Sequence, residues 1–173
     1  MLLRILVTLA FLACGATGAA DPSDAERLAT SLAKWTNVKE ACGGNYTYKV
    51  LRTSFTGYRA ETIVVVKANK VVERRFDTAT PTKPGEPAPL KTEWVETGKD
   101  IGKHKGAAEP RTLDELYTIA KKIVEAEVPA KHVRSLGLDK QGLLQHCFVR
   151  DTRIQDDAPL TGVTSIYLTV GKK

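Results

Sequence analysis

The sequence predicts an α+β domain, with an antiparallel sheet of five to six strands and two amphipathic helices packed on one face. Three observations lead to this class. Residues 21–44 and 112–129 place apolar side chains three and four positions apart, the period of an amphipathic helix. Residues 46–77 and 131–170 contain runs that alternate apolar and polar residues, as half-buried strands do. Short turns separate these runs, which indicates hairpins and therefore antiparallel pairing.

The first predicted helix is capped at Asp21 and ends at the glycine pair Gly43-Gly44. Pro22 suits the first helical turn, because its missing amide would have no partner there. Cys42 follows Val38 by four residues, so its sulfur is expected on the buried side of the helix. The apolar stripe comprises Ala25, Leu28, Ala29, Leu32, Trp35 and Val38.

A first strand over 46–51 and two further strands over 58–77 follow this helix, and the last two are joined at Ala68-Asn69-Lys70. A Pro/Lys-rich excursion then runs over about 79–111 and holds five of the eight prolines. Within it, the stretch "LKTEWVET" at 90–97 alternates like one more strand.

The second helix has the clearest start and stop signals in the sequence. Thr112 and Glu115 form a capping-box pattern, and Pro129 ends the helix. After it, two strands are expected around a turn at 139–142, and "GVTSIYLTV" at 162–170 is expected to form one last strand. The apolar stripe of the helix comprises Leu113, Leu116, Ile119, Ala120 and Ile123.

Residues 1–20 have the three-part layout of a secretory signal peptide. Arg4 precedes an apolar run, and small residues follow up to Ala20. Cleavage there would leave a single secreted domain over 21–173, with 25 Lys and Arg against 20 Asp and Glu and a net charge of +5. An uncleaved anchor and a lipoprotein signal around Cys14 are the alternatives.

Two cysteines, Cys42 and Cys147, belong to the predicted mature chain. In an oxidising compartment two cysteines most simply form one disulfide. This bridge would join the end of the first helix to a strand near the C-terminus and close a loop of about 105 residues, which the chain-entropy model values at about 4–5 kcal/mol. Two free buried thiols are the alternative.

Several segments resemble an uncharacterised family of small secreted or lipid-anchored domains, found in bacteria and among extracellular proteins of some invertebrates. They are "YTY", "TGYRAETIVVVKANKVVERRFD", "TLDELY", "LGLDKQGLLQHCFVRD" and "DDAPLTGVTSIYLTV", within about residues 44–170. The chain departs from the bacterial pattern at Asn69-Lys70, where glycine is usual, and in its longer excursion. The resemblance implies the fold and secretion, but it leaves function open because this family has no assigned activity. The matching residues are Tyr46, Tyr48, Val64, Val66, Asn69, Lys70, Val71, Val72, Thr112, Leu113, Asp114, Leu116, Tyr117, Asp139, Gly142, Asp156 and Asp157.

No pattern in the sequence predicts catalysis, a cofactor or a metal site. His146 and Cys147 are adjacent in a predicted strand, so a thiol and its base would point to opposite faces. The three histidines form no H-x-x-x-H pair, and no nucleophile elbow of the G-x-S-x-G type occurs. The acidic residues Asp151, Asp156 and Asp157 suit either a weak calcium loop or a solvated turn.

Two features are candidates for modification or binding. Asn45-Tyr46-Thr47 matches the N-glycosylation triplet directly after the glycine pair. Trp94 lies in the basic excursion outside any apolar stripe, and an exposed ring there would suit a ligand or partner. The predicted contact surface comprises Lys91, Trp94, Lys99, Lys103 and Lys105.

The sequence therefore predicts a secreted, non-enzymatic binding or extracellular-matrix-associated module of unknown ligand. An extracellular protein or an anionic polysaccharide would be drawn to the lysines by Coulomb attraction. The mild net charge gives no reason to expect nucleic acid as a partner. The alternatives are a cystatin-like protease inhibitor, although its Q-x-V-x-G hairpin is missing, and a secreted hydrolase with an unrecognised site.

Overall fold

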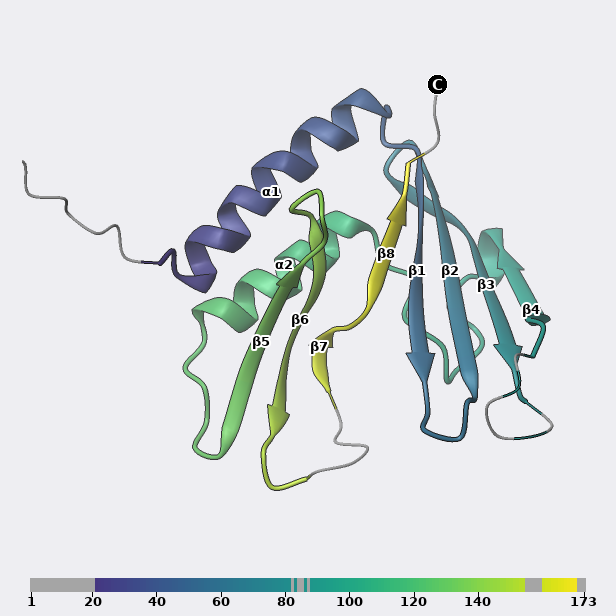
Figure 1. Ribbon diagram of the computed structural model, residues 1–173. Coiled ribbons are helices and arrows are strands. Elements are labelled where there is room, and N and C mark those ends of the chain that lie inside the picture. The colour runs from purple at the N-terminus through teal and green to yellow at the C-terminus, as the bar shows by residue number, and fades with distance from the viewer. Residues whose placement is uncertain (1–20, 82, 84–85, 87, 155–159, 171–173) are drawn as a thin grey trace, which may run out of the picture.

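The computed structural model describes residues 21–170 except 82, 84–85, 87 and 155–159 (Figure 1). The predicted signal segment and the pair Asp156-Asp157 lie outside the described residues. Neither described helix combines the length and the apolar character that a membrane-spanning helix requires. The elements are α1 (Asp24–Ala41), β1 (Tyr46–Thr53), β2 (Arg59–Lys67), β3 (Lys70–Ala79), β4 (Lys91–Thr97), the 3-10 turn η1 (Gly98–Asp100), α2 (Leu113–Glu125), β5 (His132–Leu138), β6 (Leu144–Asp151), β7 (Thr161–Val163) and β8 (Ile166–Thr169).

The strands form two antiparallel sheets, which confirms the α+β class. One sheet has five strands in the order β4-β3-β2-β1-β8, and the other has three in the order β5-β6-β7. The segment 162–170, expected to be one strand, is divided because Ser165 adopts a positive φ of 45°. The part before this kink pairs with β6 and the part after it pairs with β1, so the chain changes sheets here.

The local signals at the helix ends act largely as expected. Thr112 and Glu115 form the capping box of α2. The cap of α1 is Ser23 rather than Asp21, because the Ser23 hydroxyl accepts a hydrogen bond from the Glu26 amide, while the Glu26 carboxylate accepts one from the Ser23 amide at 2.8 Å. Gly43 and Gly44 end α1 with φ values of 60° and 69°, a conformation that suits glycine.

The expected hairpins also form. Ala68 and Asn69 both have positive φ and make the tight turn between β2 and β3, as two-residue hairpins require. The stretch at 90–97 supplies β4, which pairs with β3. The turn after Asp139 joins β5 to β6, and the Asp139 carboxylate accepts hydrogen bonds from the amides of Gln141 and Leu143.

Buried aromatic residues join the helices to the sheets. Trp35 is fully buried in α1, contacts Tyr46 edge-on at 4.9 Å between ring centroids, and donates its indole hydrogen to Asp114. Tyr48 donates its hydroxyl hydrogen to the Arg111 carbonyl just before α2. Burial raises the pKa of Tyr46 to about 12, so its hydroxyl stays neutral and accepts a hydrogen bond from the first amide of α2.

A guanidinium from the three-stranded sheet satisfies the C-terminus of α2. Arg134 in β5 donates hydrogen bonds to the carbonyls of Ile123, Val124 and Ala126 at 3.3, 2.9 and 3.2 Å. These carbonyls lack partners within the helix, and a cation there is favoured by the helix dipole. Arg134 thus fixes the end of α2 against β5.

A buried ion pair holds the irregular segment after β4 against the five-stranded sheet. Arg74 in β3 and Glu96 in β4 face each other at 2.8 and 3.0 Å, and both side chains are almost fully buried. Arg74 also donates to the carbonyls of His104 and Ala108. Glu96 accepts hydrogen bonds from the amides of Gly102 and His104 at 2.7 and 2.6 Å. The pair is therefore hydrogen-bonded on all sides.

These contacts determine the charge state of Glu96. Burial acts to raise its pKa, but the hydrogen bonds from Arg74 and from the amides of His104 and Gly102 outweigh burial and bring the pKa to about 2. Glu96 is therefore ionised across the physiological pH range.

Glu96→Ala is expected to lower the free energy of unfolding by about 3–5 kcal/mol, because Arg74 would stay buried without its counter-charge. Urea unfolding measures this change. Glu93→Ala on the same strand is the control, since Glu93 is exposed and its loss should change stability by about 0.5 kcal/mol or less. Equal, small effects of both variants would contradict the stabilising role of the pair.

The pair also predicts an acid dependence. The folded pKa of Glu96, about 2, lies below its ordinary value of 4.5, so the stabilisation is complete above about pH 4.5 and is lost as pH falls toward 2. Glu96→Gln lacks this titration, so the stability difference between wild type and variant should shrink over that interval. Unfolding curves between about pH 2 and 6 measure it, and a pH-independent difference would refute the assignment.

Candidate functional site

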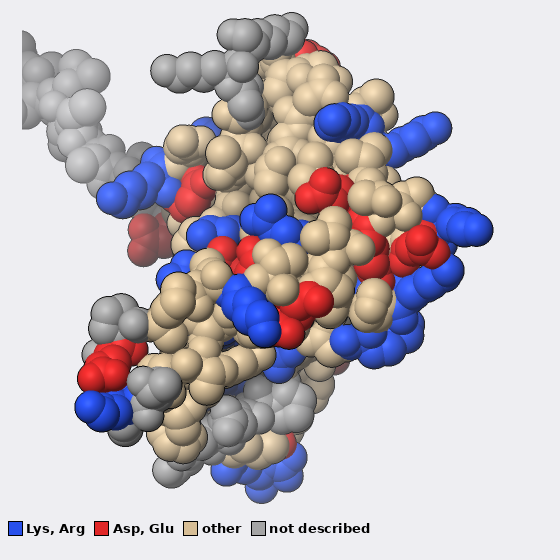
Figure 2. Space-filling view, turned by 90° about the vertical axis from the view of Figure 1, so that its right-hand side faces the viewer, with Lys and Arg blue, Asp and Glu red and all other residues tan. Residues whose placement is uncertain are grey.

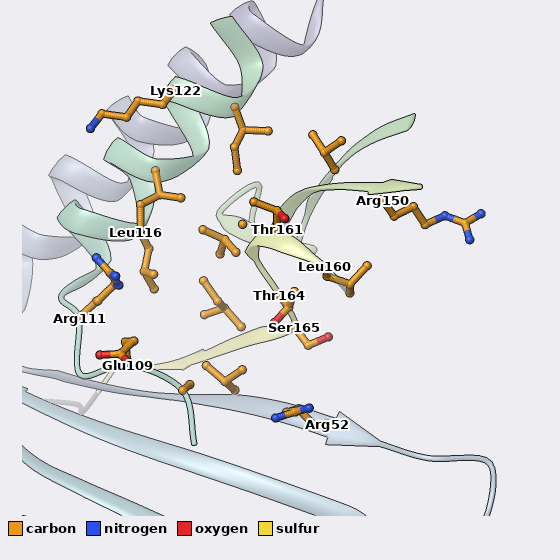
Figure 3. A pocket seen from close by; sticks show the side chains of 18 of the residues that line it. Arg52, Glu109, Arg111, Leu116, Lys122, Arg150, Leu160, Thr161, Thr164 and Ser165 are labelled. Carbon is orange, nitrogen blue, oxygen red and sulfur yellow. The ribbon is translucent and has the colours of Figure 1, made fainter. Parts of the chain in front are cut away.

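An open cleft of about 1660 Å³ lies between the two sheets (Figure 3). One wall is the inner face of β1 with the start of β8, another is α2 and its C-terminal loop, and the third is formed by β6 and β7. The side chains thus come from segments far apart in the sequence.

The middle of the cleft is apolar. Leu116, Ile119 and Ile123 reach it from one side of α2, spaced three and four residues apart. The opposite walls add aliphatic side chains from the strands and from the loops beside them, namely Val50, Val149, Ile154, Leu160, Val163 and Ile166. The helix can serve both the core and the cleft because Leu113, Tyr117, Ala120 and Val124 pack inward on its other side.

The cleft is open because the two sheets separate at the kink. β8 pairs with β1 only from Thr47 to Val50, and β7 pairs with β6 over three residues. Beyond the bond from the Leu51 amide to the Ser165 carbonyl, no described strand pairs with the rest of β1 on this side. Residues 51–53 of β1 therefore line the cleft instead of a continuous sheet.

Basic residues lie at the margins of the apolar middle, and Figure 3 shows the side chains of Lys122 and Arg150 extending away from it. Arg52, Arg111, Lys122 and Arg150 are labelled at the margins of the cleft in Figure 3, and none forms an ion pair with another described residue. The acidic lining residues are Glu109, Glu127 and Asp151. Asp151 is paired with Arg153, so its charge is largely neutralised.

The predicted contact surface is arranged differently from the expectation. Trp94 is not a freely exposed ring: it stacks on Phe76 with 5.4 Å between centroids and on His104 with 4.5 Å, and the Arg74 guanidinium lies 4.9 Å from its centroid. Lys91 and Lys99 are exposed, as are Lys103, which pairs with Asp100, and Lys105. Figure 2 views the molecule from the β4 side, and basic and acidic side chains alternate there. The lysine surface stays a prediction without the exposed tryptophan.

The expected Cys42–Cys147 disulfide is not formed, and both cysteines are buried free thiols. Cys42 is the C-cap of α1, whereas Cys147 in β6 is paired with Leu136, whose carbonyl accepts a hydrogen bond from Arg27 near the start of that helix. An 18-residue helix is about 27 Å long, and a disulfide needs Cα atoms within about 7 Å. Burial raises the pKa of Cys147 to about 11, which makes it unreactive.

The glycosylation triplet lies at the turn between α1 and β1, and Asn45 is exposed. Its side-chain amide nitrogen donates to the carbonyls of Cys42 and Gly43, both at 3.1 Å, and its oxygen accepts from the Ala68 amide. The nitrogen that would carry a glycan thus stabilises the turn. Glycosylation at Asn45 stays a prediction.

A hydroxyl and an imidazole lie within hydrogen-bonding distance of each other on the three-stranded sheet. The Ser135 hydroxyl lies 3.0 Å from His146 Nε2, and burial lowers the pKa of His146, so the neutral ring can accept this hydrogen bond. His146 forms no ion pair with a described carboxylate, and neither residue lines the cleft. Cys147 points inward, away from His146, as the strand alternation predicted. Within the described ranges, the pair has neither the carboxylate partner nor the place in the cleft that a catalytic triad needs.

Metal ligands do not cluster in the described part of the chain, where no group of three His, Cys, Asp or Glu side chains converges. Of the predicted acidic loop, only Asp151 is described. Calcium binding by that loop stays a prediction.

Comparison of the chain with protein-family models, with curated proteins and with solved structures finds no match. The resemblance noted in the sequence thus stays a prediction, and the functional conclusion depends on the cleft alone. Sequence reasoning placed Leu116, Ile119 and Ile123 on one buried stripe and missed that they line a cavity. It also missed Arg52, although its place in the row after Tyr48 and Val50 was a signal.

Intact mass after alkylation in denaturant, without reductant, should show two alkylated thiols in the purified domain, because Cys42 and Cys147 are too far apart to bridge. Under native conditions near pH 8, Cys147 should stay unmodified, since it is buried and its pKa is about 11. A domain that is two hydrogens lighter and resists alkylation would show a disulfide and contradict the structure.

Proposed function

We propose that the protein is an exported, non-enzymatic binding module that holds the apolar chain of a lipid-like small molecule in the cleft between its sheets. The observation that carries the proposal is the partly exposed aliphatic lining: Ile119, Ile123 and Val149 are only half-buried among the described residues, and Ile154 and Leu160 beside them are exposed. Water against these side chains is unfavourable, and a ligand that replaces it gains about 25 cal/mol for each Å² of apolar surface buried.

The cleft is large enough to hold a lipid-like molecule. Small-molecule sites usually occupy about 300–1,000 Å³ and are mostly apolar with a few polar groups, and the volume here, about 1660 Å³, exceeds that range. Burial of one methylene contributes about 0.8 kcal/mol, so ten methylenes give about 8 kcal/mol before the costs of association. Association costs at least about 4 kcal/mol, which leaves about 4 kcal/mol and a millimolar dissociation constant, so micromolar binding needs a longer chain of about sixteen methylenes.

The concave shape favours a small molecule over a protein partner. The walls come from α2 and from both sheets, so the lining surrounds its ligand on several sides. A protein surface would need an extended, accessible patch, whereas residues such as Leu116 and Val163 lie buried at the bottom of the cleft.

Ile119→Glu is expected to weaken binding of the neutral dye N-phenyl-1-naphthylamine by at least about tenfold, because a carboxylate in the apolar middle must be desolvated by the bound ligand. Fluorescence titration of the purified domain measures the dissociation constant. Thr118→Glu is the matched control, since it places the same charge on the exposed side of the same helix turn.

The wild type should bind the dye saturably, and Thr118→Glu should bind it equally well. Circular dichroism and thermal unfolding verify that both variants are folded. Absence of saturable binding by the wild type, or full binding by a folded Ile119→Glu variant, would overturn the proposal.

A further inference from the structure

We infer that the ligand of the cleft carries an anionic head group, a carboxylate or a phosphate, and that Arg52 binds this group. The inference rests on the proposed function and adds the chemical class of the ligand. It starts from the position of one arginine on a face that is otherwise largely apolar.

Arg52 lies on the inner row of β1. Tyr46, Tyr48 and Val50 occupy the preceding positions of this row and are buried, and side chains two apart on a strand share a face. Arg52 continues the row at the open end of the strand, opposite Ala60 of β2. A cation is therefore located where the pattern of the strand would place an apolar residue.

The guanidinium has little to bind within the protein. Its one hydrogen bond to another described residue is a long contact of 3.4 Å with the Gly106 carbonyl, and it forms no ion pair in the described part of the chain. Arg59, its neighbour across the hairpin, pairs with Glu61 instead. Most of the five donor hydrogens of Arg52 are thus available to a ligand.

The same contrast holds for the arginines as a set. The described arginines outside the cleft are all ion-paired, and they are Arg27, Arg59, Arg74, Arg75, Arg134 and Arg153. The described arginines that line the cleft are Arg52, Arg111 and Arg150, and none of these is paired. The unpaired arginines of the described chain therefore all line the cleft, where an anionic ligand would supply the missing charge.

The acidic residues of the lining do not cancel this charge. Asp151 is paired outside the cleft with Arg153, which leaves Glu109 and Glu127 against the three arginines and Lys122. Among the described lining residues, basic side chains therefore outnumber unpaired carboxylates, which favours a carboxylate or phosphate over a neutral or cationic head group near Arg52.

Arg52 also lies where two cavities meet. It lines the apolar cleft and a neighbouring cavity of about 300 Å³, which is lined in addition by Ser54, Tyr58 and Phe76. The larger cavity suits an apolar chain, and the smaller one offers hydroxyl-bearing residues beside the guanidinium. A single-chain amphiphile would place its head at Arg52 and its chain among the residues of α2.

The test is displacement of N-phenyl-1-naphthylamine from the purified domain by amphiphiles that share one chain and differ in the head. Oleate and oleoyl lysophosphatidate carry anionic heads, oleyl alcohol a neutral one and oleylamine a cationic one. Both anionic probes, or one of them, should displace the dye at about tenfold lower concentration than the alcohol, because a charge-assisted hydrogen bond adds to burial of the chain. Which of the two is preferred identifies the head group.

Arg52→Gln should weaken binding of the preferred anionic probe about tenfold and leave oleyl alcohol within about twofold, and Arg52→Lys should retain most of the affinity. Arg59→Gln is the matched control, because it removes the same charge from the adjacent strand outside both cavities. It should bind like the wild type.

The proposed function and the head-group inference can be contradicted independently of each other. If the wild type does not bind the dye at all, the cleft is not a ligand site and the proposed function fails. If the dye and oleyl alcohol bind but the anionic probes show no advantage, or a folded Arg52→Gln variant binds them like the wild type, the head-group inference is overturned and the proposed function stands. Preference for oleylamine would also overturn it.

Discussion

The buried ion pair between Arg74 and Glu96 is the interaction on which the rest of the structure depends. Residues 98–111 contain no regular structure beyond one 3-10 turn, so their path is set by side-chain contacts rather than by a hydrogen-bond ladder. Arg74 and Glu96 together bond the backbone at Gly102, His104 and Ala108. These hydrogen bonds fix the path of the chain up to the start of α2 and thereby the position of one margin of the cleft. Hydrogen bonds within the protein replace the water that both charged groups lose on burial, which is the condition under which a buried charge is tolerated.

The cleft itself follows from a second constraint, the kink at Ser165. A continuous last strand would join the two sheets and bring their inner faces together around α2. Since the strand instead changes sheets, both sheets keep their own partners and diverge beyond the kink. Ile119 and Ile123 of α2 are then only partly covered by the described part of the chain. An apolar ligand would complete the packing that the fold leaves unfinished.

The pairing of arginines with carboxylates differs between the cleft and the rest of the surface. Across most of the surface, arginines are matched by carboxylates, and such exposed pairs contribute little to stability but leave no strong field. Around the cleft the matching stops, and Arg52, Arg111 and Arg150 lack partners among the described residues. The coincidence of partly exposed apolar side chains with unpaired arginines connects the shape of the cleft to the chemistry of the proposed ligand.

The sequence by itself determined the elements that depend on local interactions. The capping box at Thr112, the Gly43-Gly44 stop, the turn at Ala68-Asn69 and the strand around Trp94 all follow from short-range backbone chemistry, and the helical and strand periods indicate which side chains are buried. The position of Arg52 on the inner row of β1 could have been read from the same alternation. Its lack of a partner could not, because pairing depends on residues distant in sequence.

Tertiary structure decided everything that requires two distant segments to meet. The distance between Cys42 and Cys147 depends on how α1 lies over β6, and counting cysteines therefore predicted a bridge that the fold does not form. Trp94 is covered because the His104 ring stacks on it, and the alternation of apolar and polar residues cannot predict this contact. The segment is divided at Ser165 because the residues before it pair with β6 and the residues after it pair with β1. Local propensity determined the elements of this protein, and the long-range pairing of these elements created its cleft.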